Sequence, residues 1–294
     1  MITMDAMHKP ALRTDYQDRL SRVTDYIYDH IDEELDLEHL AGIACLSPYH
    51  WHRVYQAVLG ETVVDTVKRL RLQRAAAELA HSRAPIGKIA TRAGYGSEPA
   101  FNRSFREAFG MPPGRFRREG SHTRFTRHEA GKDDDMHALA IRELPPLRVA
   151  AIEHEGPYLE IGRAFDRLFG VLVPRGLVRA QPRLVGIYLD DPTAVPQAKL
   201  RSRAGLIIDN AFPIEAPLGL ATILAGPYAV LSHQGPYADM KPAYDWLFGD
   251  WLVQSGREAA DAPVFEEYLN SPRDTPPTEL RTDIHLPLRP KAAS

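Results

Sequence analysis

The feature that most constrains this chain is a 17-residue segment that occurs twice in its second half. The segment 154–170 recurs as 233–249, 79 positions later, and nine of the 17 aligned residues are identical. Both copies contain His-x-Gly-Pro-Tyr followed by Ala-x-Asp-x-Leu-Phe-Gly. A duplication of this kind predicts two similar halves packed about a pseudo-twofold axis, with a cleft between them. Because such clefts commonly hold small molecules, the repeat favours ligand binding.

The first half of the chain contains a different repeat, in which a short helix, a tight turn and a longer helix follow one another twice. The two copies span 37–59 and 86–109, and a helix over 62–82 is expected to join them. A further amphipathic helix is predicted over 15–31. This is the helix-turn-helix plan, in which the second helix enters the major groove of DNA. A connecting helix of about 20 residues would be about 30 Å long, close to one turn of B-DNA.

The second half has the sequence pattern of an α+β domain. Eight short β-like runs lie between 137 and 286, and two helices interrupt them, at 159–173 and 238–254. The predicted fold class is therefore two domains, an N-terminal all-α tandem helix-turn-helix and a C-terminal α+β domain with a duplicated, pseudo-twofold antiparallel sheet. We place the DNA-binding domain at 14–118, a linker at 119–135 and the small-molecule-binding domain at 136–290.

Charge is unevenly distributed along the 294 residues. The whole chain carries a net charge of −3, yet residues 41–128 hold 15 basic and 6 acidic side chains. A basic block in an acidic protein suits a polyanion such as double-stranded DNA; the alternative is a solvated basic face without a partner. Cys45 is the one cysteine, no apolar run reaches the ~20 residues of a membrane span, and residues 1–14 lack a signal-peptide pattern. We expect a cytoplasmic protein that makes no membrane contact.

Two sets of motifs carry a resemblance to known families. Residues 16–118 resemble the tandem helix-turn-helix domain of the AraC/XylS regulators, through Leu37-Glu38-His39-Leu40-Ala41 and, more specifically, Phe101-Asn102-Arg103-Ser104-Phe105 with Phe109-Gly110-Met111-Pro112-Pro113. Residues 137–288 are similar to the GyrI-like effector-binding domain. The residues that carry this likeness are the two His-x-Gly-Pro-Tyr segments, Gly186-Ile187, Asp190-Asp191-Pro192 and Phe265-Glu266-Glu267-Tyr268.

The first resemblance implies which residues contact DNA. Base-reading positions lie at the exposed start of each recognition helix, and here they are Tyr49, His52, Arg53, Glu98, Pro99, Asn102 and Arg103. Arginine can pair with guanine, asparagine with adenine, and glutamate with cytosine. Arg115 and Arg117 are expected to hold backbone phosphates. The alternative for each residue is an exposed polar side chain that meets only phosphate or solvent.

The second resemblance implies an effector site around Glu266 in the floor of a cleft. A carboxylate in an apolar cleft is costly unless it is paired, and a cationic or hydrogen-bonding ligand offsets that cost. The candidate aromatic walls are Tyr158, Tyr237, Trp246, Trp251 and Tyr268. The alternatives are an internally paired carboxylate at Glu266 and core roles for the aromatic residues, which we favour for Trp251. His154 and His233 are expected to stabilise turns.

These features together predict a ligand-responsive transcription regulator of the AraC family, most commonly an activator, and not an enzyme. The expected partners are double-stranded DNA, a small amphipathic or cationic effector and RNA polymerase, and the protein is expected to be a monomer or weak dimer. The chain shows no catalytic, metal-binding or cofactor-binding motif. Two other functions stay open: hydrolysis of strained electrophilic compounds by a GyrI-like cleft, and sequestration of a toxic compound or a protein target.

Overall fold

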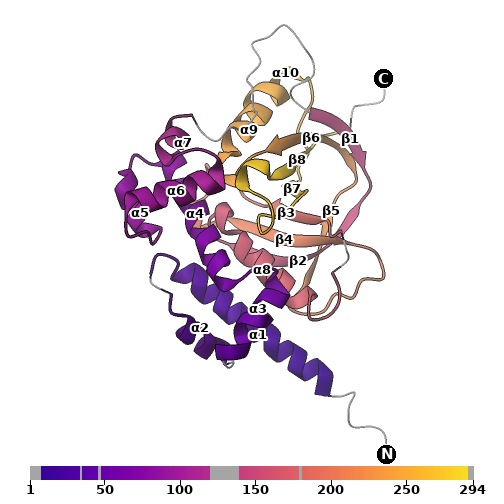
Figure 1. Ribbon diagram of the computed structural model, residues 1–294. Coiled ribbons are helices and arrows are strands. Elements are labelled where there is room, and N and C mark those ends of the chain that lie inside the picture. The colour runs from indigo at the N-terminus through magenta and orange to yellow at the C-terminus, as the bar shows by residue number, and fades with distance from the viewer. Residues whose placement is uncertain (1–7, 34, 46–47, 120–138, 179–180, 291–294) are drawn as a thin grey trace, which may run out of the picture.

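A computed structural model describes residues 8–33, 35–45, 48–119, 139–178 and 181–290 (Figure 1). The predicted linker, apart from Glu119, lies outside these residues. Among the described residues, no helix is both long enough and apolar enough to cross a lipid bilayer.

The N-terminal half consists of helices whose ends are set by local capping. Their bounds are α1 (His8–Asp29), α2 (Leu37–Ala44), α3 (Pro48–Leu59), α4 (Val63–His81), α5 (Ile86–Arg92), α6 (Glu98–Phe109) and α7 (Pro113–Glu119). Asp36, Thr62 and Ser97 each accept hydrogen bonds from backbone N–H groups at the start of α2, α4 and α6. Gly110 ends α6 in the left-handed region at φ 71°, which glycine adopts without strain.

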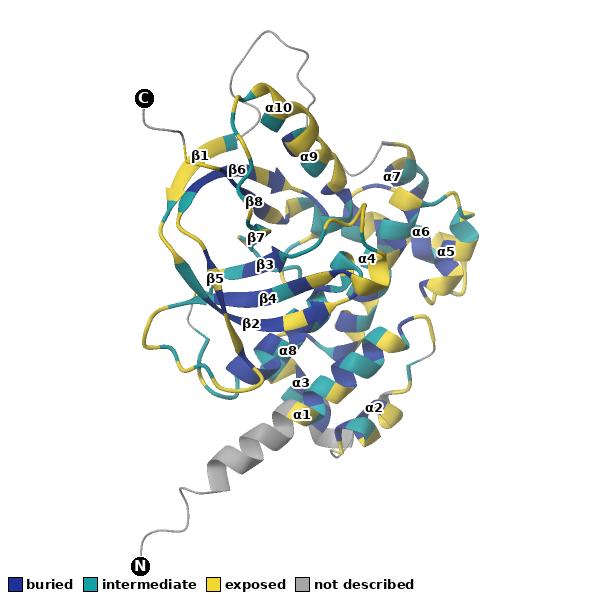
Figure 2. Ribbon diagram, turned by 180° about the vertical axis from the view of Figure 1, so that it is seen from behind, coloured by how far each residue is buried: buried dark blue, intermediate teal, exposed yellow. Residues whose placement is uncertain are grey.

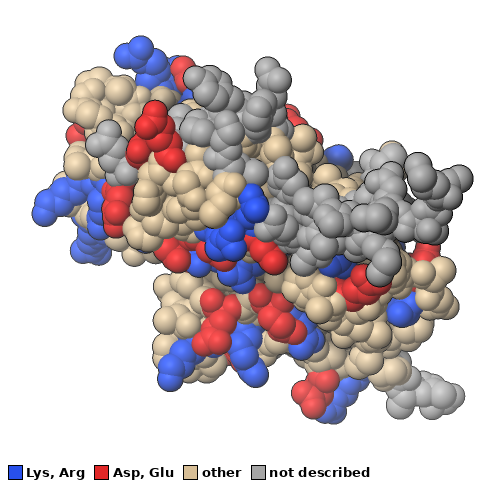
Figure 3. Space-filling view, turned by 90° about the horizontal axis from the view of Figure 1, so that it is seen from below, with Lys and Arg blue, Asp and Glu red and all other residues tan. Residues whose placement is uncertain are grey.

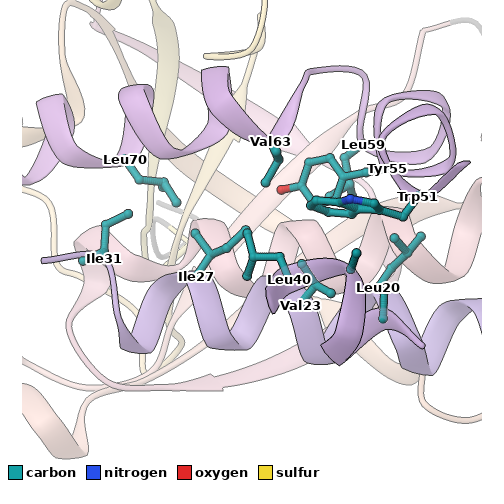
Figure 4. Packing of buried hydrophobic residues seen from close by; sticks show 12 residues of the cluster. Leu20, Val23, Ile27, Ile31, Leu40, Trp51, Tyr55, Leu59, Val63 and Leu70 are labelled. Atoms are coloured by element: carbon teal, nitrogen blue, oxygen red, sulfur yellow. The ribbon is translucent and has the colours of Figure 1, made fainter. Parts of the chain in front are cut away.

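The helical half contains two separate apolar cores, one in each helix-turn-helix unit. The first unit packs α1, α2, α3 and the start of α4 around the fully buried Trp51 and Tyr55 (Figure 4). The second packs the rest of α4 with α5, α6 and α7 around Phe101, Phe105 and Phe109. Helix α4 belongs to both cores, so it fixes the spacing between the two helix-turn-helix units.

The C-terminal half is a curled sheet of eight antiparallel strands (Figures 1 and 2). The strands are β1 (Leu139–Leu144), β2 (Leu147–Glu155), β3 (Leu184–Tyr188), β4 (Arg201–Ile208), β5 (Gly219–Ile223), β6 (Gly226–Gln234), β7 (Val264–Tyr268) and β8 (Arg281–Pro287). Their spatial order is β1-β6-β8-β7-β3-β4-β2-β5. Strands β3 and β7 therefore lie at the centre of the sheet, one from each half of the internal repeat.

Two helical segments pack against this sheet, one for each repeat. The first consists of a 3-10 turn, η1 (Tyr158–Glu160), and α8 (Gly162–Leu172), and the second of η3 (Tyr237–Asp239) and α9 (Lys241–Trp246). Helix α8 buries Ala164 and Leu168 against β2 and β4, whereas α9 buries Ala243 against β6 and β8. A π-helical turn (Leu247–Trp251) and α10 (Leu252–Gln254) extend α9. Two short 3-10 turns, η2 (Gln197–Lys199) and η5 (Pro277–Glu279), precede β4 and β8.

The predicted fold class is confirmed, and three details differ from expectation. Helix α1 begins at His8 rather than near residue 15. Helix α7, which begins at Pro113, lies beyond the last helix predicted from the sequence, which ends at 109. The long helix expected over 238–254 is divided into a 3-10 turn, an α-helix, a π turn and a short α-helix.

The helical half packs directly on the sheet domain. Helix α1 lies beside α8, where Arg167 forms a two-point ion pair with Asp25 at 2.7 and 3.1 Å and Arg163 pairs with Asp29 at 2.6 Å. Further along the chain, α4 lies against η3, and Ala238 of that turn packs on the core of the second helix-turn-helix unit. Both units are thus attached to the C-terminal domain. On the face shown in Figure 3, acidic and basic side chains are intermingled.

Phe105→Ala tests the core of the second helix-turn-helix unit. Phe105 is fully buried and its ring contacts Phe101, Phe109 and Phe116. Removing a buried phenyl ring leaves a cavity, so the free energy of unfolding should fall by about 3–5 kcal/mol. Urea unfolding followed by circular dichroism measures this loss, with the exposed Glu107→Ala as control. A loss below about 1 kcal/mol would show that Phe105 is not a core residue.

Candidate functional site

The candidate site is a carboxylate enclosed by tyrosine hydroxyl groups at the centre of the sheet. Glu266 lies in β7 with only 5% of its surface exposed. Tyr244 donates to its Oε1 atom at 2.7 Å, and Tyr188 and Tyr268 each lie 3.0 Å from Oε2. The hydroxyl groups of Tyr188 and Tyr268 are themselves 2.7 Å apart. We refer to Glu266, Tyr188, Tyr244 and Tyr268 as the tyrosine cage.

The cage lies on the pseudo-twofold axis of the internal repeat. Gly186 of β3 pairs directly with Glu266 of β7 in the antiparallel register. Aromatic residues that hold equivalent places in the two repeats lie around this pair: Tyr188 and Tyr268, Tyr158 and Tyr237, and Phe165 and Tyr244. The duplication thus supplies a ring of aromatic residues. At its centre the first copy has Gly186 and the second has Glu266, so the ring encloses one carboxylate.

Gly186 leaves the space that the cage occupies. A Cβ atom at this position would lie 2.7 Å from the hydroxyl oxygen of Tyr268, 3.1 Å from that of Tyr188 and 3.3 Å from Cδ1 of Ile161. The two tyrosine hydroxyl groups can meet over Glu266 only because the facing residue has no side chain.

Burial dominates the electrostatics of the cage. Loss of solvent raises the pKa of Glu266, and the hydrogen bonds from Tyr244, Tyr268 and Tyr188 oppose this rise. Burial, followed by the charge of Glu266, raises the pKa of all three tyrosines well above the ordinary value. The tyrosines are therefore hydrogen-bond donors at neutral pH, and the carboxylate is more basic than a solvent-exposed one.

Of the residues predicted to form the effector site, four lie at or beside the cage. Glu266 and Tyr268 belong to it. The ring of Tyr237 packs edge-on against Tyr268 with centroids 5.5 Å apart, and Tyr158 packs edge-on against Tyr188 at 4.7 Å. The hydroxyl group of Tyr158 lies 2.7 Å from the carbonyl oxygen of Asp190 and is occupied by the β3–β4 turn.

Trp246 and Trp251 belong to an apolar cluster that also includes Tyr237 and the cage residue Tyr244. Both are partly buried against the apolar core that α9 forms with β6 and β8, which includes Leu247 and Leu286. A core position agrees with the role favoured for Trp251 on the basis of its helical spacing.

Tyr188, Tyr244 and Phe165 were not predicted as site residues, although the repeat in the sequence points to them. Tyr244 and Phe165 are equivalent positions of the 79-residue repeat. Tyr188 is 80 residues before Tyr268, because one additional residue separates the later strands of the two copies. An alignment of the repeats extended beyond residue 170 with this one-residue shift pairs Tyr188 with Tyr268.

The candidate DNA-contacting residues lie in α3, α6 and α7. Glu98 and Arg103 are exposed on α6, as is Pro99. Asn102 is half-buried, and among the described residues no donor reaches its buried Oδ1 atom. The backbone of α3 is described, but the side chains of Tyr49, His52 and Arg53 lie outside the described part of the chain.

The two phosphate-contact candidates of α7 differ in their surroundings. Arg115 is exposed. Arg117 is half-buried and donates from Nη2 to the carbonyl oxygen of Ala84 at 2.6 Å. This bond ties α7 to the end of α4, so Arg117 has a structural role within the helical half.

Each half of the chain matches a known protein family. Residues 137–289 match the GyrI-like small molecule binding domain, and residues 40–119 match a helix-turn-helix domain. The chain belongs to the GyrI-like family. Its helical half is a helix-turn-helix domain of the AraC type. Both resemblances drawn from the sequence motifs are thereby confirmed.

Individual relatives match one half of this GyrI-like protein each. The regulatory protein SoxS of Salmonella typhimurium is 30% identical over 102 residues, which cover 35% of this chain and 95% of SoxS. A DNA gyrase inhibitor of Yersinia enterocolitica is 33% identical over 141 residues, covering 46% of this chain and 88% of that protein. The uncharacterized regulator YbfP of Bacillus subtilis is 30% identical over 102 residues, 35% of each chain. The match thus spans about a third of the length of YbfP.

Gly186→Ala tests the geometry of the cage. The new methyl group would collide with the hydroxyl groups of Tyr188 and Tyr268, so at least one of them must leave Glu266. We expect a free energy of unfolding lower by about 1–3 kcal/mol, measured by urea unfolding. Gly249→Ala, where a Cβ atom meets nothing within 4 Å, is the control. Equal stability of the Gly186→Ala variant and the parent would show that the two hydroxyl groups do not need this space.

Glu266→Gln tests the raised pKa of the buried carboxylate. Because the pKa is higher in the folded state than in the unfolded one, ionisation of Glu266 opposes folding. The stability of the parent relative to Glu266→Gln should therefore be greatest below the ordinary carboxyl pKa, and should decline by about 1.4 kcal/mol per pH unit up to the folded-state pKa. Urea unfolding of both proteins from pH 4 to 8 measures the difference. A difference independent of pH would show that Glu266 titrates like an exposed carboxylate.

Proposed function

We propose that this protein is a sequence-specific, DNA-binding transcription regulator whose activity responds to a small amphipathic or cationic effector bound at the tyrosine cage. The helical half supplies DNA recognition and the GyrI-like half supplies the effector site. The observation that carries the proposal is the buried, tyrosine-ringed Glu266 in a chain that also holds two helix-turn-helix units.

The arrangement of the helical half supports DNA binding. Helix α4 joins two complete units, and the start of α6 presents Glu98 and Arg103 to solvent on a helix otherwise anchored by three buried phenylalanines. An exposed, rigidly held helix start is how helix-turn-helix proteins contact base edges. One chain with two units can cover an asymmetric site, so dimerisation is not required; contact with RNA polymerase is part of the same proposal.

The chemistry of the cage supports an effector that carries positive charge or hydrogen-bond donors. The carboxylate has all its hydrogen bonds from neutral phenols, so its negative charge has no cationic partner among these contacts. Aromatic rings lie around it, and the faces of such rings attract quaternary ammonium groups. A lipophilic cation that replaces one or more of the tyrosine hydroxyl groups neutralises the buried charge, which is the source of its binding free energy.

Arg103→Ala tests sequence recognition. The guanidinium group of Arg103 is exposed at the start of α6, where it can pair with guanine. Specific binding to the DNA upstream of its own gene should weaken by about 1–3 kcal/mol while binding to scrambled DNA changes far less. Arg289→Ala removes an equal charge from an exposed ion pair in the other domain and serves as control. Equal loss on both DNAs would make Arg103 a phosphate contact only.

Glu266→Gln tests the effector site. Calorimetry with benzyltrimethylammonium should detect binding to the parent and at least about tenfold weaker binding to the variant, because the buried charge that attracts the cation is gone. Binding to the parent should also weaken as the pH falls through the raised pKa of Glu266, since protonation has the same effect as the substitution. Unchanged affinity in the variant would place the cation site elsewhere.

A further inference from the structure

One loop of the sheet domain connects the tyrosine cage with both recognition helices. It joins β7 to β8 over residues 269–280, and we call it the β7–β8 loop. Its first residue follows Tyr268, whose hydroxyl group lies 3.0 Å from the carboxylate of Glu266. Its last turn is η5, which leads directly into β8. Any movement of the end of β7 is therefore transmitted to this loop.

Arg273, near the middle of the loop, holds the end of the first recognition helix. Its guanidinium group donates to the carbonyl oxygen of Leu59, the last residue of α3, and to the buried carboxylate of Asp166 on α8. It also lies 3.9 Å from Glu61 and 4.7 Å above the ring centroid of Phe169. The Arg273 side chain is only 15% exposed, so it is a component of the interface and does not face DNA.

The end of the same loop touches the second recognition helix. Turn η5 lies against α6. A Cβ atom at Gly110, the residue that ends α6, would come within 4.0 Å of the Cγ2 atom of Thr278 in η5. A single loop of the sheet domain thus contacts the C-terminal end of α3 at Arg273 and that of α6 at Thr278.

The internal repeat provides a built-in reference for this loop. The equivalent connection, between β3 and β4, has the same turn: Asp190 accepts from the N–H group of Arg201 at 2.7 Å, as Asn270 accepts from that of Arg281 at 2.8 Å. The position of Arg273 is taken there by the exposed Thr193, which bonds to Asp191 of its own turn.

The helices that flank the two loops show the same asymmetry. The buried Asp166 receives Arg273 and accepts from the hydroxyl group of Tyr28 of α1 at 3.2 Å. Its repeat equivalent, Asp245, is exposed and pairs with Lys241 on its own helix. Likewise Phe169 packs on the core of the first helix-turn-helix unit, whereas Phe248 is 41% exposed. Helix α8 of the first copy thus docks the first helix-turn-helix unit, and it does so with the help of Arg273, which the second copy supplies at the position where the first copy has Thr193.

We propose that the β7–β8 loop is the coupling element between the effector site and DNA recognition, with Arg273 as the positioning residue. This inference rests on the proposed function of the cage. An effector that displaces Tyr268 from Glu266 shifts the start of the loop, and Arg273 and η5 pass that shift to the ends of α3 and α6. Because both recognition helices contact the same loop, a shift of this loop moves the ends of both helices.

Amide hydrogen exchange on the full chain tests the inference without any operator DNA. In the Arg273→Gln variant, exchange should rise by about fivefold or more in the last turn of α3 and along α1 and α8. The variant loses the bond to Leu59 of α3 and the ion pair with Asp166 of α8, which also accepts from Tyr28 of α1. Exchange in β7 and β8 should stay as in the parent. Asp245→Asn, which alters the equivalent residue of the other repeat, should match the parent, and Arg273→Lys, which keeps the charge but not both contacts, should fall between.

The same samples are then compared with and without benzyltrimethylammonium. In the parent and in Asp245→Asn, the cation should change exchange at the ends of α3 and α6; in Arg273→Gln, calorimetry should show the cation still binding while these changes are lost. Unaltered exchange in Arg273→Gln without the cation, or a retained response with it, would overturn the proposal. Failure of the cation to bind the parent would count against the proposed effector class, and the comparison without cation would still decide the role of Arg273.

Discussion

The structure of this protein depends on a carboxylate buried at the axis of an internal duplication. An ionised side chain removed from water is strongly destabilising unless hydrogen bonds replace its hydration. Glu266 obtains these bonds from three tyrosines that come from both repeats and from β3, β7 and α9. The two halves of the sheet domain must therefore meet in one register, with Gly186 opposite Glu266, for the carboxylate to be accommodated.

The duplicated domain uses its two copies for different tasks. Around the axis the copies contribute equally, and their aromatic residues form one ring. At the outer surface they differ: α8 is covered by α1 and α3, whereas Phe248, in the π turn that extends α9, is exposed. The ion pairs of Arg163, Arg167 and Arg273 all lie on the covered side. The first helix-turn-helix unit is thus attached to the α8 side of the duplicated domain, and Arg273 connects that surface to the cage through β7.

Local sequence signals predicted the elements well, and long-range pairing accounts for what they did not predict. The α3 bounds follow from Pro48 and Gly60, and the strands follow from apolar runs between turns, because these signals act over a few residues. Glu266 and Tyr268 were predicted to line the site, but the partnership of Glu266 with Tyr188 and Tyr244 depends on strand register across the sheet. The sequence could not predict the contrast between Asp166 and Asp245 either. The two aspartates hold the same place in the same motif, yet Asp166 is buried against the helical half and Asp245 is exposed.

The central claim is that effector binding at the cage and DNA binding by the helical half are linked, and a calorimetric cycle tests it most directly. Benzyltrimethylammonium is titrated into the free protein and into its complex with the DNA upstream of its gene, at one salt concentration and pH. Linkage predicts cation affinities that differ by about fivefold or more between the two titrations, and an equal factor in DNA affinity when the order of addition is reversed. Identical cation affinities in the free protein and in the DNA complex would contradict the account.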